Sequence, residues 1–379
     1  MPRRVKQSDI KPSVTRLLWG RAGARCEFAG CNKPLWKSDV TQESVALAER
    51  AHIYAASDYG PRGNAGVPTY SLNDFDNLIL VCPDCHKVID KEADGGRYTA
   101  EVLRGWKAAH ESRIEQVTGI TPDMGSHVVH YGAPVGELAK PLNFKMTAPA
   151  LFPERYPASD RPISLEMVNT VWRDQEDGFW HIEEENLCRQ FDEKLAPLIT
   201  SGAVDHLSVF GFAPQPLLVK LGALITDIQE STVFQLRREP AGWGWDHNAD
   251  PIRIELIRPE TTEGDPALVF SISATITPER VHKVTSDDTA IWEVRAETPH
   301  NDLVRSPGHL RAFRELVRPV LDEIKKHHGQ TTPVHVFPAM PVAFATELGR
   351  IRMPKADSPW VIYDQNNKRG GFVEAVRLG

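Results

Sequence analysis

The run from Cys82 to Asp90, CPDCHKVID, constrains this chain more than any other stretch. Two cysteines separated by two residues are typical of a turn that supplies half of a tetrahedral zinc site. His86 and Asp90 are four residues apart, so they share one face of a helix that starts here. The run therefore predicts a structural metal site beside a second polar site that could serve catalysis.

The remaining cysteines decide how the first site is completed. Cys26 and Cys31 form a second close pair, and Cys188 stands alone among the five cysteines. Short-spaced pairs in an intracellular chain favour metal binding over disulfides. We expect Cys26, Cys31, Cys82 and Cys85 to bind a structural Zn²⁺ and Cys188 to be a small buried residue.

Length and charge limit the class of protein. A chain of 379 residues predicts two or three domains. It has no run of 18 apolar residues and no apolar signal segment near its first residue, so we expect a cytoplasmic protein without a membrane span. Residues 1–120 carry 17 Lys/Arg and 15 Asp/Glu, whereas the rest carries 27 and 36. The basic first 25 residues could contact phosphates or could simply be solvated, and the acidic remainder disfavours long polyanions.

The front of the chain reads as strand, loop, strand and helix, each with a polar residue. Residues 45–54 have apolar side chains at period two and carry His52, residues 77–81 begin with Asn77, and His86 opens a helix. Flanking helices are expected at 13–25 and 99–117, capped by Ser13 and Thr99. A histidine can deprotonate water, and a second histidine with a carboxylate can bind a divalent cation. Phosphodiester hydrolysis needs both.

These residues resemble a known family. The matching motifs are Ala51-His52-Ile53, Asn77-Leu78-Ile79-Leu80 and Cys82-x2-Cys85-His86-x3-Asp90. They are similar to the HNH endonucleases over about residues 13–115. The resemblance implies a zinc-stapled ββα-metal fold with His52 as general base, Asn77 as its orienting partner and His86 as a Mg²⁺ ligand.

The chain departs from the family at Ala51, where many members carry an acidic residue or histidine that binds the cation. We expect Asp90, at helical spacing from His86, to replace that ligand, with Glu49 as the alternative. Arg62, in the loop between the two strands, could contact a phosphate or could remain a solvated loop residue.

Prolines mark the middle of the chain. The sequence Thr118-Gly119-Ile120-Thr121-Pro122 ends the preceding helix, and six further prolines follow up to Pro162 without a sustained period. Such a stretch is typical of a domain connection, although residues 128–131 could form a short strand. We therefore expect a front domain at 1–120, a linker at 121–162 and a rear domain at 163–379.

The rear part repeats a strand–helix–strand pattern. One copy comprises residues 207–212, 216–228 and 232–236. The other comprises 334–337, 342–351 and 360–363, and a helix at 307–327 precedes it. Such units predict a parallel sheet that binds ligands at the strand ends. At an offset of 127 residues the identical pairs are Val209/Val336, Phe210/Phe337, Pro214/Pro341, Leu221/Leu348, Gly222/Gly349 and Ser231/Ser358. They favour a duplicated Rossmann-like half, although any two such units can share a few residues.

A duplicated unit would form a quasi-symmetric pocket that suits a cyclic dinucleotide. Trp243 and Trp245 could stack on bases or could pack in the core. Gln235 and Arg238 could bind base edges or phosphate. The candidate pocket residues are Phe212, Pro214, Gln215, Gln235, Arg238, Trp243, Trp245, Pro338, Ala339 and Met340.

A second resemblance covers about residues 163–379. Its motifs are Phe210-x-Phe-Ala-Pro-x-Pro-Leu-Leu, Gln235-x2-Arg238, Gly242-Trp-x-Trp245 and Val336-Phe-Pro-Ala-x-Pro341. They resemble the SAVED domain, a fusion of two CARF-like Rossmann-type halves. The expected fold class is therefore α+β in front and α/β behind.

The whole chain resembles the HNH–SAVED effectors of CBASS anti-phage defence. The resemblance implies a cyclic di- or trinucleotide activator, for example a cyclic GMP-AMP, and a homo-oligomer on activation. It also implies cleavage of double-stranded DNA with little sequence specificity. Two alternatives stay open: a restriction-type HNH enzyme whose rear domain recognises modified or specific DNA, and a non-enzymatic zinc-knuckle binding protein.

Overall fold

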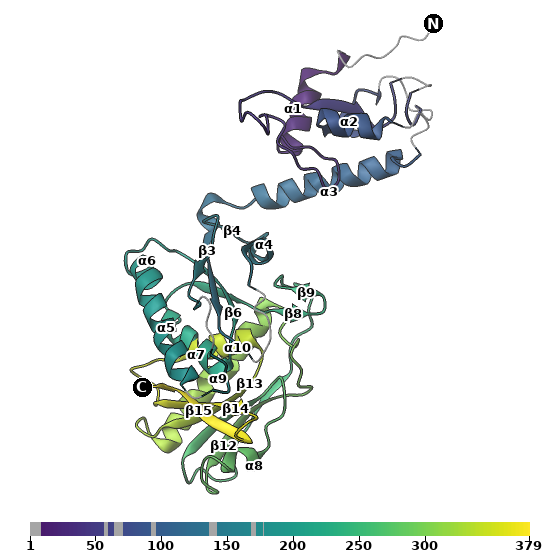
Figure 1. Ribbon diagram of the computed structural model, residues 1–379. Helices are drawn as coiled ribbons and strands as arrows, with labels where there is room; N and C mark the ends of the chain where they lie inside the picture. The colour runs from purple at the N-terminus through teal and green to yellow at the C-terminus, as the bar shows by residue number, and fades with distance from the viewer. Residues whose placement is uncertain are drawn as a thin grey trace. The chain divides into compact units, whose positions relative to one another are not determined.

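The computed structural model describes residues 9–56, 60–63, 71–91, 96–135, 142–167, 172–176 and 178–379. The chain divides into two compact units, Met1–Thr121 and Pro122–Gly379, which we call unit 1 and unit 2. Figure 1 labels many of their helices and strands. None of the helices within the described ranges is long and apolar enough to cross a membrane.

Unit 1 contains a two-stranded sheet and three α-helices in the described ranges. Its elements are α1 (Pro12–Arg21), β1 (Glu49–His52), the 3₁₀ turn η3 (Phe75–Asn77), β2 (Leu78–Val81), α2 (Pro83–Ile89) and α3 (Ala100–Thr118). Strands β1 and β2 are antiparallel, with His52 opposite Leu78. Every residue of β2 is buried, so this strand forms the centre of the small core.

Two helix ends in unit 1 test the sequence predictions. The Thr99 cap is confirmed, because its Oγ1 accepts a hydrogen bond from the Val102 amide at 3.3 Å. The Ser13 cap is wrong: the N-cap residue is Lys11, two residues earlier, and Ser13 lies in the first turn of α1. The same helix ends at Arg21 rather than Arg25, because Gly23 and Ala24 adopt positive φ angles of 57° and 54° and reverse the chain.

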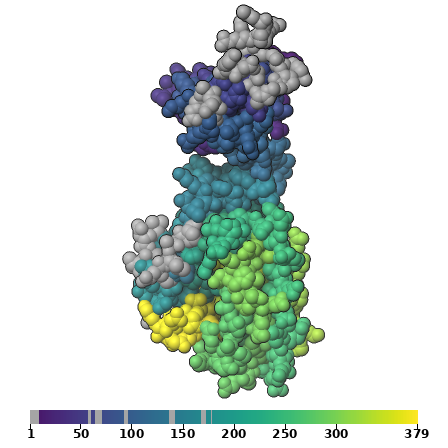
Figure 2. Space-filling view, turned by 90° about the vertical axis from the view of Figure 1, so that its right-hand side faces the viewer, coloured from purple at the N-terminus to yellow at the C-terminus, as the bar shows by residue number. Residues whose placement is uncertain are grey.

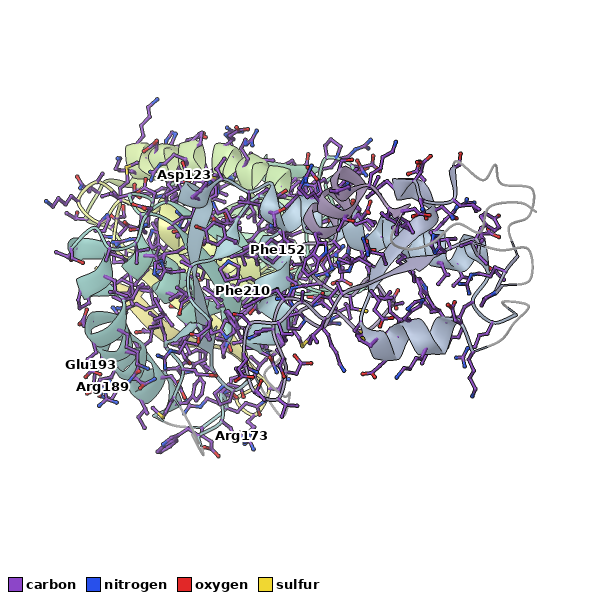
Figure 3. All side chains as sticks on the ribbon, turned by 90° about the horizontal axis from the view of Figure 1, so that it is seen from above. Asp123, Phe152, Arg173, Arg189, Glu193 and Phe210 are labelled. Atoms are coloured by element: carbon purple, nitrogen blue, oxygen red, sulfur yellow. The ribbon has the colours of Figure 1, made fainter. Side chains whose placement is uncertain are left out.

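The first half of unit 2 is built on parallel strands. After η4 (Pro122–Met124), its elements are β3 (Gly125–Gly132), α4 (Phe144–Thr147), η5 (Ala148–Leu151), β4 (Tyr156–Pro157), β5 (Ile163–Ser164), α5 (Phe179–Lys194), α6 (Ala196–Thr200), β6 (Leu207–Phe212), α7 (Gln215–Ile225) and β7 (Ser231–Phe234). The strand order is β4-β3-β6-β7, and β5 also pairs with β3. Helix α5 has a buried face and an exposed face, and Arg189 and Glu193 lie on the exposed one (Figure 3).

Strand β3 corrects the predicted linker. It pairs in parallel with β6 from His127 to Gly132, and its last five residues are buried. Residues 125–132 are therefore a central strand of unit 2, and the stretch from residue 122 to 162 is part of that unit. The suggested strand at 128–131 is confirmed and is longer than predicted. The described prolines of this stretch lie outside β3, and Pro157 lies in the two-residue edge strand β4, where a missing N–H is tolerated.

The second half of unit 2 carries a larger sheet. Its elements are β8 (Arg237–Arg238), β9 (Ala241–Gly242), β10 (Ile254–Ile257), β11 (Pro266–Ser271), α8 (Pro278–His282), β12 (Ala290–Ala296), α9 (Pro307–His328), β13 (Val334–Ala339), α10 (Val342–Ile351), β14 (Trp360–Asn366) and β15 (Gly371–Leu378). The strand order is β10-β12-β11-β13-β14-β15, with parallel pairing from β12 to β14 and antiparallel edges. The C-terminal residues, which include the edge strand β15, appear in yellow at the surface in Figure 2.

The two halves repeat one topology, as the offset of 127 residues predicts. The unit β6-α7-β7 is parallel, and so is β13-α10-β14. Helices α7 and α10 pack against each other, and they do so through the paired glycines. A Cβ on Gly222 would lie 1.9 Å from the Thr346 carbonyl oxygen, and one on Gly349 would lie 1.9 Å from the Val219 carbonyl oxygen. Only glycine lets the two backbones approach this closely.

Candidate functional site

The four predicted cysteines of unit 1 converge. Cys26 and Cys31 follow α1, whereas Cys82 and Cys85 lie at the start of α2. Their Sγ atoms all lie within 4.8 Å of one another. Zn–S bonds of about 2.3 Å in a tetrahedron place sulfurs roughly 3.8 Å apart, so a small contraction would make a zinc site. Burial raises the pKa of Cys26 to about 12, so a bound cation has to displace thiol protons.

His52 lies at the end of β1 and pairs with a residue that the sequence analysis missed. Its Nε2 donates a hydrogen bond to the Asn73 Oδ1 atom at 2.8 Å. Nδ1 therefore carries the lone pair that can accept a proton. Burial lowers the pKa of His52, which keeps the ring neutral near pH 7. Asn73 precedes a short apolar strand, and that position is the only sequence signal for it.

Asn77 has a different role from the predicted one. Its Oδ1 accepts a hydrogen bond from the Tyr54 amide at 2.8 Å, and its Nδ2 donates to the carbonyls of Tyr54 and Leu72 at 3.0 and 2.9 Å. The Asn77 side chain therefore forms its hydrogen bonds with backbone groups, and the side chain that bonds to the His52 ring is Asn73. Asn77 fixes the chain just beyond His52, so it acts on that residue through the backbone.

His86 lies in α2 between two carboxylates. Its Nδ1 contacts the Glu49 Oε2 atom, and its Nε2 lies 3.2 Å from the Asp90 Oδ2 atom. The Asp90 hydrogen bond, followed by the one to Glu49, outweighs burial and raises the pKa of His86. Both acidic residues considered as replacements at Ala51 therefore reach the same imidazole. The two carboxylates face opposite ring nitrogens, so His86 could share a divalent cation with one of them at a time, once that nitrogen has lost its proton.

Arg62 contradicts the predicted phosphate contact. Its side chain is only 4% exposed. The guanidinium donates to the carbonyls of His52, Ile53 and Ile89 and to the Asp90 carboxylate. A phosphate could not reach these donors without breaking the contacts, so Arg62 is an internal clamp. Loop position alone suggested exposure, and the sequence carries no sign of these backbone acceptors.

Unit 2 has a pocket where the ends of parallel strands of both halves meet. It has a volume of about 260 Å³ and is lined by Val135, Asp174, Phe212, Ala213, Pro214, Gln215, Gln235, Leu236, Arg238, Asn301, Asp302, Met340, Pro341, Val342 and Asp364. The predicted Phe212, Pro214, Gln215, Gln235, Arg238 and Met340 are among these residues. Gln215 and Gln235 come from the first half of unit 2, whereas Met340 follows β13 of the second half.

Two glutamines bridge the halves at this pocket. The Oε1 atom of Gln215 accepts a hydrogen bond from the Met340 amide, and that of Gln235 accepts one from the Ala343 amide, both at 3.1 Å. Met340 lies just before α10, and Ala343 lies in its first turn, where helix amides lack partners within the helix. The pocket is therefore held together by cross-half hydrogen bonds.

The pocket also contains acidic residues that the sequence analysis missed. Asp302 accepts a hydrogen bond from the Arg238 amide at 3.0 Å. Burial, reinforced by nearby Asp174, raises the pKa of Asp364 to about 7. Asp364 lies in β14 just beyond the predicted strand 360–363, so the rule that ligands bind at strand ends could have found it.

Four predicted pocket residues do not line it. Trp243 is fully buried and packs edge-on against Phe210 at 5.2 Å (Phe210 is labelled in Figure 3), and Trp245 stacks on Phe234 at 5.6 Å. Both tryptophans therefore take the core-packing role. Pro338 and Ala339 lie within β13, where they pair with β11. Neither residue is among those that line the pocket.

Comparison with known proteins identifies unit 2. A model of the "SMODS-associated and fused to various effectors sensor domain", SAVED, matches residues 187–378. The chain belongs to the SAVED family. The matched residues include Gln215, Gln235 and Asp364, which line the pocket of this SAVED domain. No curated protein matches the sequence.

Solved structures similar to the chain include SAVED/CARF-domain containing receptors called Cap4. The Acinetobacter baumannii receptor with the cyclic trinucleotide 2'3'3'-cAAA is 12% identical, with a TM-score of 0.46, covering 78% of this chain and 62% of the receptor. The Moraxella osloensis receptor is 10% identical, with a TM-score of 0.41, covering 73% and 54%. The chain thus spans less than two thirds of the length of these receptors.

Proposed function

We propose that this protein is a DNA endonuclease that a cyclic oligonucleotide activates. The SAVED domain is the sensor, and unit 1 is an HNH nuclease that uses a divalent cation. The proposal includes a homo-oligomer on activation, a cytoplasmic location and a role in CBASS anti-phage defence, with double-stranded DNA as substrate. A cyclic trinucleotide bound to an Acinetobacter baumannii Cap4 receptor illustrates the class of activator.

The observation that carries the nuclease proposal is the pair of carboxylates, Glu49 and Asp90, that contact His86, because Glu49 lies on the strand that ends in His52. Arg62 donates both to the His52 carbonyl and to Asp90, so the two histidine-bearing segments are joined through one guanidinium. His52 Nδ1 would accept a proton from the attacking water. His86 and one of the two carboxylates that contact it would hold Mg²⁺, which supplies charge stabilisation for the phosphate and the leaving oxygen.

The cysteine cluster supports a structural role for Zn²⁺ in the same unit. The Sγ atoms of all four cysteines lie within 4.8 Å of one another, so a metal bound by all four would have a complete set of protein ligands. A four-cysteine zinc site is closed to substrate and contributes folding free energy directly. The zinc would therefore hold the loop after α1 against the start of α2, which carries His86.

The pocket supports the sensor proposal. Its volume of about 260 Å³ lies just below the roughly 300–1,000 Å³ of pockets that enclose a drug-sized ligand. It would therefore take one part of a cyclic di- or trinucleotide, such as a base. Gln215 and Gln235 line the pocket, although the Nε2 atom of Gln235 already donates to the Leu236 carbonyl at 2.7 Å. Arg238 also lines it, is exposed and could contact a phosphate.

A plasmid-cleavage assay tests the proposal. Purified full-length protein is incubated with supercoiled plasmid and Mg²⁺, alone and with each member of a panel of cyclic di- and trinucleotides. We expect nicking or linearisation with one class of cyclic nucleotide and none without. The matched variants are His52→Ala, which should bind nucleotide without cutting, and Arg238→Glu, which should need more nucleotide.

The same assay decides between this proposal and its alternative. Sequence-dependent cutting without any nucleotide would favour a restriction-type HNH enzyme and would refute gating. If neither the panel nor Mn²⁺ in place of Mg²⁺ produces cutting, the nuclease proposal fails and a non-enzymatic zinc protein remains.

A further inference from the structure

Arg62 combines burial, backbone strain and saturation of its side chain. Its φ angle is 65°, in the left-handed region that residues with a side chain rarely adopt. Its Nε donates to the Ile53 carbonyl at 2.6 Å, one terminal nitrogen donates to the Ile89 carbonyl at 2.8 Å, and the other is shared between His52 and Asp90. A strained backbone conformation persists where the surrounding contacts hold it in place. The four hydrogen bonds of the Arg62 guanidinium are contacts of this kind.

The contacts join two particular places. His52 and Ile53 lie at the end of β1, whereas Ile89 and Asp90 lie at the end of α2. The last carbonyls of a helix lack partners within the helix and attract a positive charge. One planar guanidinium therefore fixes the separation between the segment that carries His52 and the helix that carries His86.

Arg62 also distinguishes the two acidic residues that contact His86, because it binds Asp90 and not Glu49. It binds the Oδ1 atom of Asp90 at 2.7 Å, while the Oδ2 atom of the same carboxylate faces His86 at 3.2 Å. Both oxygens of Asp90 are thus engaged, and its charge is neutralised by a buried cation. Glu49 faces the other ring nitrogen of His86, and its side chain is 43% exposed. The Asp90 side chain is 35% exposed, so solvent reaches both carboxylates. They differ because Arg62 binds an oxygen of Asp90 but not of Glu49, which leaves Glu49 as the carboxylate available to a cation.

We propose that Arg62 is a positioning residue of the nuclease centre: it sets His52 against His86 and commits Asp90 to orienting His86, which leaves Glu49 as the carboxylate that binds the divalent cation. This inference deepens the proposed nuclease function and depends on it for its catalytic meaning. It reverses the preference for Asp90 that helical spacing alone suggested. Residues that orient a metal ligand typically affect affinity by about 10–100-fold when replaced.

The decisive variant is Arg62→Gly in the full-length protein. Glycine adopts a φ of 65° readily, so the change removes the guanidinium and relieves the backbone at once. Mn²⁺ binding is measured by calorimetry, zinc content by elemental analysis, and cleavage by the plasmid assay. We expect unchanged zinc and a circular dichroism spectrum like that of the wild type, with Mn²⁺ affinity and cleavage rate both lowered about 10–100-fold. Low millimolar guanidinium should restore part of each loss.

Matched variants assign the separate roles. Glu49→Gln should abolish Mn²⁺ binding, whereas Asp90→Asn, which keeps an acceptor, should weaken it about tenfold or less. Arg113→Ala is the control, because Arg113 is an exposed arginine of unit 1 whose guanidinium bonds to Asn32. Its Mn²⁺ affinity and cleavage rate should match those of the wild type.

The outcomes separate this inference from the proposed function. Wild-type Mn²⁺ affinity in Arg62→Gly, or loss of zinc and of folded structure, would overturn the positioning role. Stronger loss in Asp90→Asn than in Glu49→Gln would overturn the assignment of Glu49. If the wild type cuts nothing but binds Mn²⁺ in a way that Arg62→Gly weakens, the positioning role holds and the nuclease function fails.

Discussion

The contact between α7 and α10 yields a prediction with a defined magnitude. Replacing Gly349 with alanine would put its Cβ 1.9 Å from the Val219 carbonyl oxygen, where ordinary contact begins at 3.4 Å. The shortfall is about 1.5 Å and falls on backbone atoms, so no side chain can rotate away. The two helices have to separate, although α7 and α10 are buried over most of their lengths. A gap of 0.5–1 Å already forfeits about a quarter to a half of the dispersion energy between the atoms involved.

Two effects of opposite sign decide the result. Alanine in a helix interior is favoured over glycine by about 1 kcal/mol. Overpacking a well-packed core costs about 1–3 kcal/mol, and a backbone clash belongs at the upper end. We therefore expect Gly349→Ala to lower the free energy of unfolding of unit 2 by about 2 kcal/mol, which corresponds to a Tm lower by about 4–8 °C.

The assay is denaturant unfolding of the full-length protein, followed by tryptophan fluorescence and circular dichroism. Gly308→Ala in α9 is the control: its Cβ would meet Ser306 Oγ at 3.5 Å, an ordinary contact, so stability should stay the same or rise. Gly222→Ala should resemble Gly349→Ala. The double variant should lose less than the sum, because the first alanine already separates the helices. A Gly349→Ala protein as stable as the wild type would refute the reasoning.

Three further predictions concern other parts of the molecule. Burial lowers the pKa of His206 to about 3, against about 6.5 in an unfolded chain, so the folded state binds fewer protons and stability falls as the pH drops below 6.5. Between pH 7 and pH 5 this residue should lower the free energy of unfolding by about 2 kcal/mol. A His206→Gln variant whose free energy of unfolding falls with pH as steeply as that of the wild type would contradict this prediction. Cys82→Ser should lose its zinc and unfold unit 1 while the circular dichroism of unit 2 persists; a variant with one zinc per chain would exclude the four-cysteine site. His52→Ala should cut about 10²–10⁴-fold more slowly with unchanged nucleotide affinity by calorimetry, and loss of both would assign His52 a structural role.

The sequence predicts the features of this protein that depend on local pattern. The repeat of strand, helix and strand in unit 2 follows from apolar runs and glycine positions, and α10 has the predicted limits, Val342–Ile351. The paired cysteines converge because short spacings leave few alternatives. Six of the ten pocket residues follow from the rule that parallel strands present ligands at their carboxyl ends.

Features that depend on distant contacts were not predictable. Arg62 is a clamp only because three carbonyls from two elements surround it, and no pattern near residue 62 encodes them. Asn73 and Asn77 are equivalent by residue type, and the fold alone decides which of them meets the His52 ring. A short strand could be suggested within the proline-rich stretch, but its place in the sheet of unit 2 could not, because the pairing of β3 with β6 joins residues about 80 positions apart.

The two glutamines at the pocket have a consequence for sensing. Each extends from the first half of unit 2 to a main-chain amide at or just before the start of α10 in the second half. A molecule that inserts there and attracts either amide oxygen competes with a contact between the halves. Occupancy would then be converted into a change of relative orientation within the sensor, with no separate relay needed.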